Sequence, residues 1–346
     1  MRGVVYEDVR RVRVDDLAEP RIEQRTDAVV RVTTAAICGS DLHFYHGKAP
    51  LQPGDPMGHE GAGVIEEAGP EVRRFSLGER VVISFGIVCG RCWFCARGQT
   101  SLCEEYRTLG IGTMGGDLGG TQAELVRVPA ADANLLGIPA GMEDERALFV
   151  GDILTTAVYG AAVAGIRPGD TVAVVGGGPV GFLTAQAARR HDPAEVLVLD
   201  KELERLTLAE AMGISTIDVE ARNPQSAVYD LTQGRGADVV IEAVGSVPAW
   251  ETSLSVVRRG GTLVVLGMYV SERVELQLGV AWARAVRFVF AGIAPVQAWW
   301  EEAMNAVADG SIDPQPIISH TLPLEEAPAG YELFDRRQAT KVLLKP

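Results

Sequence analysis

The first 130 residues alternate between short apolar runs and clusters of glycine, proline and charged residues. Runs of strand length bounded by turn-forming residues are typical of β-strands. Because few helical stretches interrupt them, the pattern predicts a β-rich, barrel-like domain. The predicted strands are MRGVVY, AVVRVTTAAI, GAGVIEEAG, GERVVIS and QAELVRV.

The pattern changes near Asp152, where an apolar stretch with helical spacing runs to Ala164. Strands and helices then alternate, and several of the strands are apolar throughout, as expected of a parallel sheet buried on both faces. This order predicts a doubly wound, nucleotide-binding domain. Its predicted elements are the strand TVAVVG, a helix to Arg190, the strand EVLVLD, a helix from Leu203 to Met212, a strand near Thr216 to Val219, and the strands ADVVIEAVG and GTLVVLG.

The C-terminal part returns to the first domain in this interpretation. After about Arg287 the pattern predicts one more strand, a helix around Trp299 to Ala308, and a closing KVLLKP segment. A chain of 346 residues is too long for one ordinary hydrophobic core. We therefore expect one domain over 1–153, completed by 290–346, and a second over 154–289.

Composition and charge narrow the classes of partner. The chain is 47% hydrophobic and 23% charged, and its net charge of −14 disfavours binding to nucleic acid or an anionic membrane. No apolar run approaches the roughly 20 residues that span a bilayer, and the first residues lack the apolar stretch of a signal peptide. We expect a cytoplasmic protein that acts on a small molecule.

Four of the five cysteines lie close together in one segment. Their spacing, C-x2-C-x2-C-x7-C, lets four thiolates converge on one tetrahedral zinc ion from a single loop. Because protein would fill all four positions, such a zinc is structural. The alternative is four unrelated thiols. The residues are Cys89, Cys92, Cys95 and Cys103.

A second metal site is possible from residues far apart in the chain. A thiolate, an imidazole and a carboxylate can hold zinc and leave its fourth position open, which Lewis-acid catalysis requires. Cys38, His59 and Asp152 supply these groups, and Glu60 follows His59 directly. Each has an ordinary alternative: Cys38 as a core thiol, and His59 with Glu60 as a hydrogen-bonded structural pair.

A glycine-rich turn follows the strand TVAVVG. Gly176, Gly178 and Gly181 form a G-x-G-x-x-G motif that opens a helix, whose N-terminal N–H groups suit a pyrophosphate. The next strand ends in Asp200, where a carboxylate binds the ribose hydroxyls of NAD and repels the 2′-phosphate of NADP. Lys201 and Arg205 follow and keep NADP as an alternative.

Taken together, CGSDLH, GHEG, the cysteine segment and Gly151-Asp152 resemble in order and spacing the zinc-containing medium-chain alcohol and polyol dehydrogenases. The resemblance covers essentially the whole chain. It implies an α/β plus β-rich fold: a GroES-like barrel catalytic domain with an inserted doubly wound (Rossmann) coenzyme domain. It also implies two zinc ions per chain, NAD as coenzyme, and reversible hydride transfer between an alcohol and an aldehyde or ketone.

The resemblance assigns roles to individual residues. Cys38, His59 and Asp152 match the catalytic zinc ligands, with Asp152 where other members have cysteine or glutamate. Glu60 matches a carboxylate that orients the ligands and in some members swings onto the metal, so both roles stay open for it. Ser40 and His43 match a proton relay. The positions that match coenzyme contacts are Thr156, Gly176, Gly178, Pro179, Val180, Gly181, Asp200, Arg205, Ala243, Val244, Leu266, Gly267 and Met268.

Substrate and assembly stay open at this point. The resemblance indicates Phe85 as a substrate-pocket wall, with Met57, Tyr106 and Met268 as weaker candidates. Gly39 stands where some members bind pyrophosphate with arginine, and Arg337 or Lys341 is either a substitute or part of a solvated face.

Two other functions remain as alternatives: a polyol or sugar dehydrogenase, suggested by CGSDLHFYHG, and a redox-silent dinucleotide-binding protein. The resemblance implies a homotetramer, or a homodimer. We expect its seam to be a strand near Glu272 to Leu278, added across the coenzyme domain.

Overall fold

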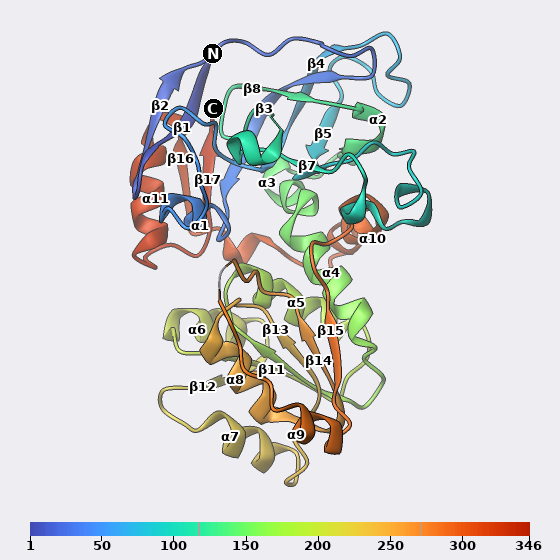
Figure 1. The fold of residues 1–346 in the computed structure, drawn as a ribbon, viewed down its shortest axis with the longest axis vertical. Helices are drawn as coiled ribbons and strands as arrows, with labels where there is room; N and C mark the ends of the chain where they lie inside the picture. The colour runs from blue at the N-terminus through green and yellow to red at the C-terminus, as the bar shows by residue number, and fades with distance from the viewer. Residues whose placement is uncertain (117, 271) are drawn as a thin grey trace. The chain divides into compact units, whose positions relative to one another are not determined.

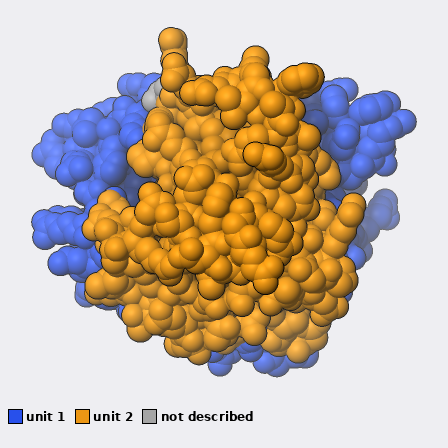
Figure 2. Space-filling view, turned by 90° about the horizontal axis from the view of Figure 1, so that it is seen from below, with its two compact units in different colours: residues 1–155, 295–308, 314–346 blue, residues 156–294, 309–313 orange. Residues whose placement is uncertain are grey.

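The computed structural model describes residues 1–116, 118–270 and 272–346, which form two compact units (Figure 1). Unit 1 comprises residues 1–155, 295–308 and 314–346, coloured blue in Figure 2. Unit 2 comprises residues 156–294 and 309–313, coloured orange.

Unit 1 is built on a largely antiparallel sheet in the order β16-β17-β3-β4-β5-β9, with β8 also paired to β3. The long strand β3 (Ala28–Ile37) is almost entirely buried and pairs with β17, β4 and β8. Through β17 the C-terminal segment adds a strand to this sheet beside β3.

The remaining strands of unit 1 flank this sheet. They are β1 (Arg2–Asp8), β2 (Arg11–Asp16), β4 (Glu60–Ala68), β5 (Arg80–Ile83), β6 (Gly86–Ile87), β7 (Arg107–Thr108), β8 (Leu125–Val128), β9 (Leu135–Gly137), β16 (His320–Pro323) and β17 (Val342–Lys345). Its helices are α1 (Asp41–Tyr45), α2 (Ala131–Asn134), α3 (Asp144–Ala147), α10 (Val296–Ala308) and α11 (Ala327–Asp335). Its 3-10 turns are η1 (Cys95–Arg97), η2 (Thr100–Leu102), η3 (Gly112–Gly115), η4 (Leu148–Gly151), η5 (Gln315–Ile317) and η6 (Leu324–Glu326).

Unit 2 is a parallel six-stranded sheet in the order β12-β11-β10-β13-β14-β15. This is the doubly wound order in which ligands bind at the carboxyl ends of the strands. Its strands are β10 (Thr171–Val175), β11 (Glu195–Asp200), β12 (Ser215–Asp218), β13 (Ala237–Glu242), β14 (Val257–Val265) and β15 (Arg287–Phe290). Its helices are α5 (Pro179–Arg189), α6 (Leu203–Ala211), α7 (Pro224–Leu231), α8 (Val247–Val256) and α9 (Leu278–Ala283); α4 (Ile153–Ala164) begins in unit 1 and continues into unit 2.

The segment near Glu272 to Leu278, expected as a strand at a seam between subunits, does not pair with a strand of its own chain in the described residues. Its pairing with a second copy stays a prediction. Residues 272–277 have no regular structure, and α9 begins at Leu278. The edge of the sheet is β15. Two contacts hold the segment against the domain: Leu276 packs on the core beneath the sheet, and the Trp250 indole donates a hydrogen bond to the Glu275 carbonyl at 3.1 Å.

Within the described residues no single helix is long and apolar enough to cross a bilayer. One bent pair, Asp144–Gly151 with Ile153–Ala164, meets the length and composition criteria only when its two halves are joined.

Candidate functional site

Three predicted metal ligands converge in unit 1 from separate elements. Cys38 follows β3, His59 precedes β4, and Asp152 lies between η4 and α4; all three are buried. Cys38 Sγ lies 3.7 Å from Asp152 Oδ2, and His59 Nε2 lies 3.3 Å from the same oxygen. One donor atom from each side chain lies within 4.8 Å of the others.

Asp41 fixes the orientation of His59 from behind. Its Oδ1 lies 3.1 Å from His59 Nδ1, while its Oδ2 accepts a hydrogen bond from the Cys38 backbone N–H at 2.9 Å. Gln122 also donates to Asp41 Oδ2 at 3.2 Å, and the Tyr331 hydroxyl donates to Gln122 at 3.0 Å. A partner on Nδ1 directs Nε2 toward Cys38 and Asp152, the arrangement that metal-binding histidines need.

The electrostatics of this cluster call for a cation. Burial raises the pKa of the Cys38 thiol. Burial by itself lowers the pKa of His59, but the carboxylates of Asp41 and Asp152 outweigh it and raise that pKa well above its usual value. Acidic groups therefore outnumber cations in a buried space, and a divalent ion bound by a thiolate, an imidazole and a carboxylate would neutralise them. The donor set fits zinc.

Glu60 lies beside these ligands and forms a buried ion pair with Lys341. The two side chains are 0% and 1% exposed, with Lys341 Nζ 2.5 Å from Glu60 Oε2. Burial raises the pKa of Glu60, although Lys341 opposes this shift. Burial lowers the pKa of Lys341, but Glu60 outweighs it and raises that pKa. The expectation that Lys341 belongs to a solvated face is wrong, whereas Arg337 is exposed.

The two residues of the predicted proton relay lie in and just before the short helix α1. Ser40 Oγ lies 3.0 Å from His59 Nε2, in direct contact with the ligand cluster. His43 lies one turn further along in the short helix α1 and is half-buried. The contact places the Ser40 hydroxyl beside the His59 nitrogen that faces Cys38 and Asp152.

Of the expected pocket walls, Phe85 has the clearest contact. Its ring meets the His59 imidazole edge to face, with the ring centroids 6.2 Å apart. Met57 is fully buried in the core of unit 1, which is a packing role. Burial raises the pKa of Tyr106, and Asp152 and His59 also act on it electrostatically. Met268 lies in unit 2 and is 44% exposed.

The four clustered cysteines converge as their spacing predicts, and none forms a disulfide. The sulfur–sulfur distances are 3.5 Å for Cys92–Cys95, 3.9 Å for Cys92–Cys103 and 3.5 Å for Cys103–Cys89. Zn–S bonds of about 2.3 Å in a tetrahedron place sulfurs about 3.8 Å apart, so the set fits zinc. Backbone N–H groups of Cys95 and Glu104 lower the pKa of Cys92 to about 6.

The glycine-rich turn joins β10 to α5 in unit 2. Gly176 has φ +104°, which a side chain would strain, and a Cβ at Gly181 would lie 1.8 Å from the Gly176 carbonyl oxygen. Gly178 is the N-cap of α5, and Pro179 and Val180 form its first turn. The turn therefore presents the N-terminus of α5 as the anion site that a pyrophosphate requires.

Asp200 ends β11 beside this turn. Its Oδ2 accepts a hydrogen bond from Gly177 N at 2.6 Å and lies 3.4 Å from Arg205 Nη1. Lys201 N and Glu202 N donate to Oδ1. The carboxylate thus holds the glycine turn as well as being the predicted ribose ligand.

The remaining predicted coenzyme contacts also lie in unit 2. Ala243 and Val244 follow β13, and Leu266, Gly267 and Met268 follow β14, at the carboxyl ends of neighbouring parallel strands. Val244 is 50% exposed, and Thr156 is half-buried near the start of α4.

Sequence reasoning missed three residues that support the ligands. Asp41 sits in the quoted CGSDLH motif, and its acidic side chain three residues after Cys38 was a usable signal. Gln122 contacts Asp41 from about 80 residues further along the chain. Lys341 contacts Glu60 from about 280 residues further along. Nothing in their local sequence indicates such a contact.

Comparison with known proteins gives consistent results. Two family models match the chain: alcohol dehydrogenase GroES-like domain over residues 24–140 and zinc-binding dehydrogenase over residues 179–309. An uncharacterized zinc-type alcohol dehydrogenase-like protein of Bacillus subtilis is 35% identical, with 100% of each chain covered.

Two solved structures are also similar over the whole chain. The alcohol dehydrogenase of Thermus sp. ATN1 superposes with a TM-score of 0.95 at 42% identity, covering 100% of this chain and 99% of that one. A Sinorhizobium meliloti protein assigned as a zinc-binding dehydrogenase and bound to NADP superposes with a TM-score of 0.88 at 32% identity, covering 100% and 99%.

Proposed function

Because this chain belongs to the zinc-containing medium-chain alcohol dehydrogenases, we propose that Cys38, His59 and Asp152 hold the catalytic zinc of a zinc-dependent alcohol oxidoreductase. The convergence of these three buried donors carries the assignment. Zinc held there supplies Lewis-acid polarisation of the substrate oxygen. Asp41 keeps His59 Nε2 turned toward the metal position.

Ser40 is proposed as the group that takes the proton of the alcohol. Its hydroxyl touches the ligand cluster, and a hydroxyl can accept one proton while donating another. His43, in α1, is proposed to pass that proton outward, since an imidazole ring can accept a proton on one nitrogen and release one from the other. Phe85 forms an apolar wall that restricts the substrate beside His59.

Glu60 is proposed as a positioning residue and not as a permanent zinc ligand. Its carboxylate is already paired with Lys341, so the pair sets the local field around the ligands without adding net charge. The four clustered cysteines are proposed to hold a second, structural zinc, whose coordination they fill completely.

The coenzyme is proposed to be NAD, bound by unit 2. The glycine turn and the N-terminus of α5 would hold its pyrophosphate, and Asp200 its ribose. Bound NAD supplies the hydride acceptor, and NADH the donor when an aldehyde or ketone is reduced. NADP remains the alternative coenzyme, because the similar S. meliloti protein binds NADP. Arg205, beside Asp200, is the residue that would favour binding of its 2′-phosphate.

We assign the catalytic role to 1–153 with 290–346, and the coenzyme role to 154–289. The protein is proposed to be a cytoplasmic homotetramer, with dimers joined through the exposed edge strand β15. Neither the polyol nor the redox-silent alternative is favoured over alcohol oxidoreduction.

Zinc content and NAD reduction, measured together, test the proposal. Wild type should hold two zinc ions per chain and reduce NAD with at least one of a panel of primary, secondary, aromatic and polyol substrates. Cys38→Ala should keep one zinc and lose activity, whereas Cys95→Ala should keep the other and lose thermal stability. One zinc per wild-type chain with no activity on the panel would overturn the catalytic assignment.

A further inference from the structure

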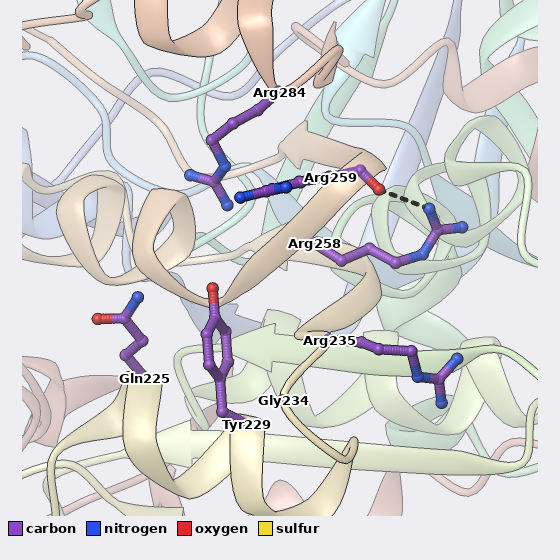
Figure 3. A pocket seen from close by; sticks show the side chains of 7 residues that line it. All are labelled: Gln225, Tyr229, Gly234, Arg235, Arg258, Arg259 and Arg284. Atoms are coloured by element: carbon purple, nitrogen blue, oxygen red, sulfur yellow. Dashed lines mark hydrogen bonds between the residues drawn. The ribbon is translucent and has the colours of Figure 1, made fainter.

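An arginine-rich pocket lies in unit 2 at the edge of the sheet opposite the coenzyme turn. It has a volume of about 630 Å³ and is lined by Arg235, Arg258, Arg259, Arg284 and Tyr229, among others (Figure 3). Arg235 precedes β13, and Arg284 precedes β15. Arg258 and Arg259 are the second and third residues of β14. In a parallel sheet these are amino ends, whereas the glycine turn follows the carboxyl end of β10.

The charge of this pocket contrasts with that of the whole chain. The chain carries 46 acidic and 32 basic side chains, yet four arginines converge here, and none of the described lining residues is acidic. Asp238, outside the lining, pairs with Arg258 at 2.5 Å. Bringing like charges together is unfavourable unless an anion compensates for it.

Backbone carbonyls hold three of these arginines in place, and among the described residues an acidic side chain pairs only with Arg258. Arg284 donates to the carbonyls of Leu254 and Val257, Arg235 to that of Thr232, and Arg258 to that of Arg259. Carbonyl acceptors fix the guanidinium planes while carrying no net charge. Such positioned guanidinium forks match the oxygens of phosphate groups.

The side chains fall into two pairs. In Figure 3 the guanidinium groups of Arg259 and Arg284 point toward each other on the side where Tyr229 lies, while those of Arg235 and Arg258 extend to the other side. Two sets of guanidinium donors in one pocket suit two linked phosphates better than one. The volume lies within the usual range for small-ligand sites and leaves room for an organic group beyond the phosphates.

We propose that this pocket binds a small molecule bearing a diphosphate group, at a site separate from the coenzyme site. The coenzyme does not account for the pocket, because ligands of doubly wound sheets bind at the carboxyl ends of the strands. A nucleic acid is a poor candidate, because the net charge of −14 repels a long phosphate backbone.

Calorimetric titration of the full-length, zinc-loaded protein with inorganic pyrophosphate tests the proposal, with NAD present at saturation so that the coenzyme site is occupied. We expect one site per chain, with affinity that falls as salt rises. Arg259→Ala should weaken binding at least tenfold; Arg259 is exposed, so its loss leaves the core intact. Arg284→Lys, which keeps the charge but loses the fork, should also weaken binding.

The matched control is the double variant Arg25→Ala with Arg31→Ala, which removes two exposed arginines of unit 1. It should leave pyrophosphate affinity unchanged. No binding to wild type, or equal weakening in the control, would overturn the proposal. Citrate binding as tightly as pyrophosphate would overturn the assignment to phosphate. Whether NAD is reduced does not enter this readout, so failure here would leave the proposed catalytic function standing.

Discussion

At the residue scale, the buried pair of Glu60 and Lys341 has a direct consequence for stability. Both charges are out of contact with solvent, so each depends on the other. Removing one partner of a buried pair leaves an uncompensated charge, at a cost of about 3–5 kcal/mol. Removing both charges together avoids that cost.

We therefore predict that Lys341→Met lowers the free energy of unfolding by about 3–5 kcal/mol, as measured by denaturant unfolding. The double variant Lys341→Met with Glu60→Gln should recover most of the loss, because no unpaired charge then remains. A Lys341→Met protein as stable as wild type would show that the pair is not buried in solution.

Glu242 provides a pH-dependent prediction in unit 2. Burial raises its pKa, even though the N–H groups of Val244 and Gly245 donate to its carboxylate and oppose the shift. The folded state therefore binds this proton more tightly than the unfolded state, whose glutamate pKa is about 4.3. Stability from this group is present below that value and is lost as pH rises through the folded-state pKa.

Glu242→Gln should remove this dependence, because the amide does not ionise. We expect the melting temperature of the variant relative to wild type to increase between pH 5 and pH 8. Glu251→Gln, at an exposed position in α8, is the matched control and should show a difference that does not change with pH. A constant difference for Glu242→Gln would contradict the prediction.

The sequence indicated the proposed ligands but not the residues that support them, for a physical reason. The cysteine cluster is recognisable from its spacing, and Cys38 and His59 from the resemblance of the motifs around them to a known family. Lys341 looks like any basic residue near a chain end. Only the pairing of β17 with β3 buries it beside Glu60, and long-range pairing is not encoded in a local pattern.

At the scale of elements, the turn between β10 and α5 uses glycine in two ways: Gly181 allows close packing of the backbone, and Gly178 leaves space for a ligand. A Cβ at Gly181 would meet the Gly176 carbonyl oxygen at 1.8 Å, whereas a Cβ at Gly178 would meet only Arg205 atoms at 3.8 Å or more. The first clash is with backbone that cannot move freely. The second position is open, and it faces the predicted pyrophosphate.

Gly181→Ala should therefore destabilise the protein by about 1–3 kcal/mol or more, since extra volume in a packed site forces the backbone to shift. Gly178→Ala should keep the wild-type melting temperature and raise the dissociation constant for NADH. Thermal unfolding and NADH fluorescence titration distinguish the two effects. Equal melting temperatures for both variants would contradict this account of the turn.

Element prediction succeeded where the apolar pattern was long. The strands β10, β11 and β13 are apolar over their whole length, and they form as expected. The alternation in Val274, Leu276 and Leu278 is also typical of a strand. There, packing of Leu276 on the core and the Trp250 hydrogen bond to the Glu275 carbonyl hold the segment against its own domain, and no strand of the described chain pairs with it.

At the scale of the whole molecule, the change from short strands to alternating strands and helices predicted a β-rich part followed by a parallel sheet. The apolar pattern did not predict which large apolar side chains of unit 2 are exposed, because that depends on which strand forms the edge of the sheet. In the structure β15 is that edge, and Phe290 in it is 70% exposed. Trp282 and Leu278 of α9 are 84% and 73% exposed.

An edge strand with large apolar side chains is a site for pairing with a second copy. A two-fold axis beside β15 would join two six-stranded sheets and cover these side chains. Wild type should accordingly have a solution mass that is a multiple of 36.9 kDa, measured by light scattering.

Phe290→Asp should reduce the mass at least twofold, because a charge at the seam is desolvated on association and repels its symmetry mate. The matched control is Leu77→Asp, since Leu77 is 66% exposed in the unit 1 loop between β4 and β5. It carries the same change in charge and hydrophobicity and should leave the mass unchanged. A monomeric wild type would refute the oligomer, and an unchanged mass for Phe290→Asp would place the seam elsewhere.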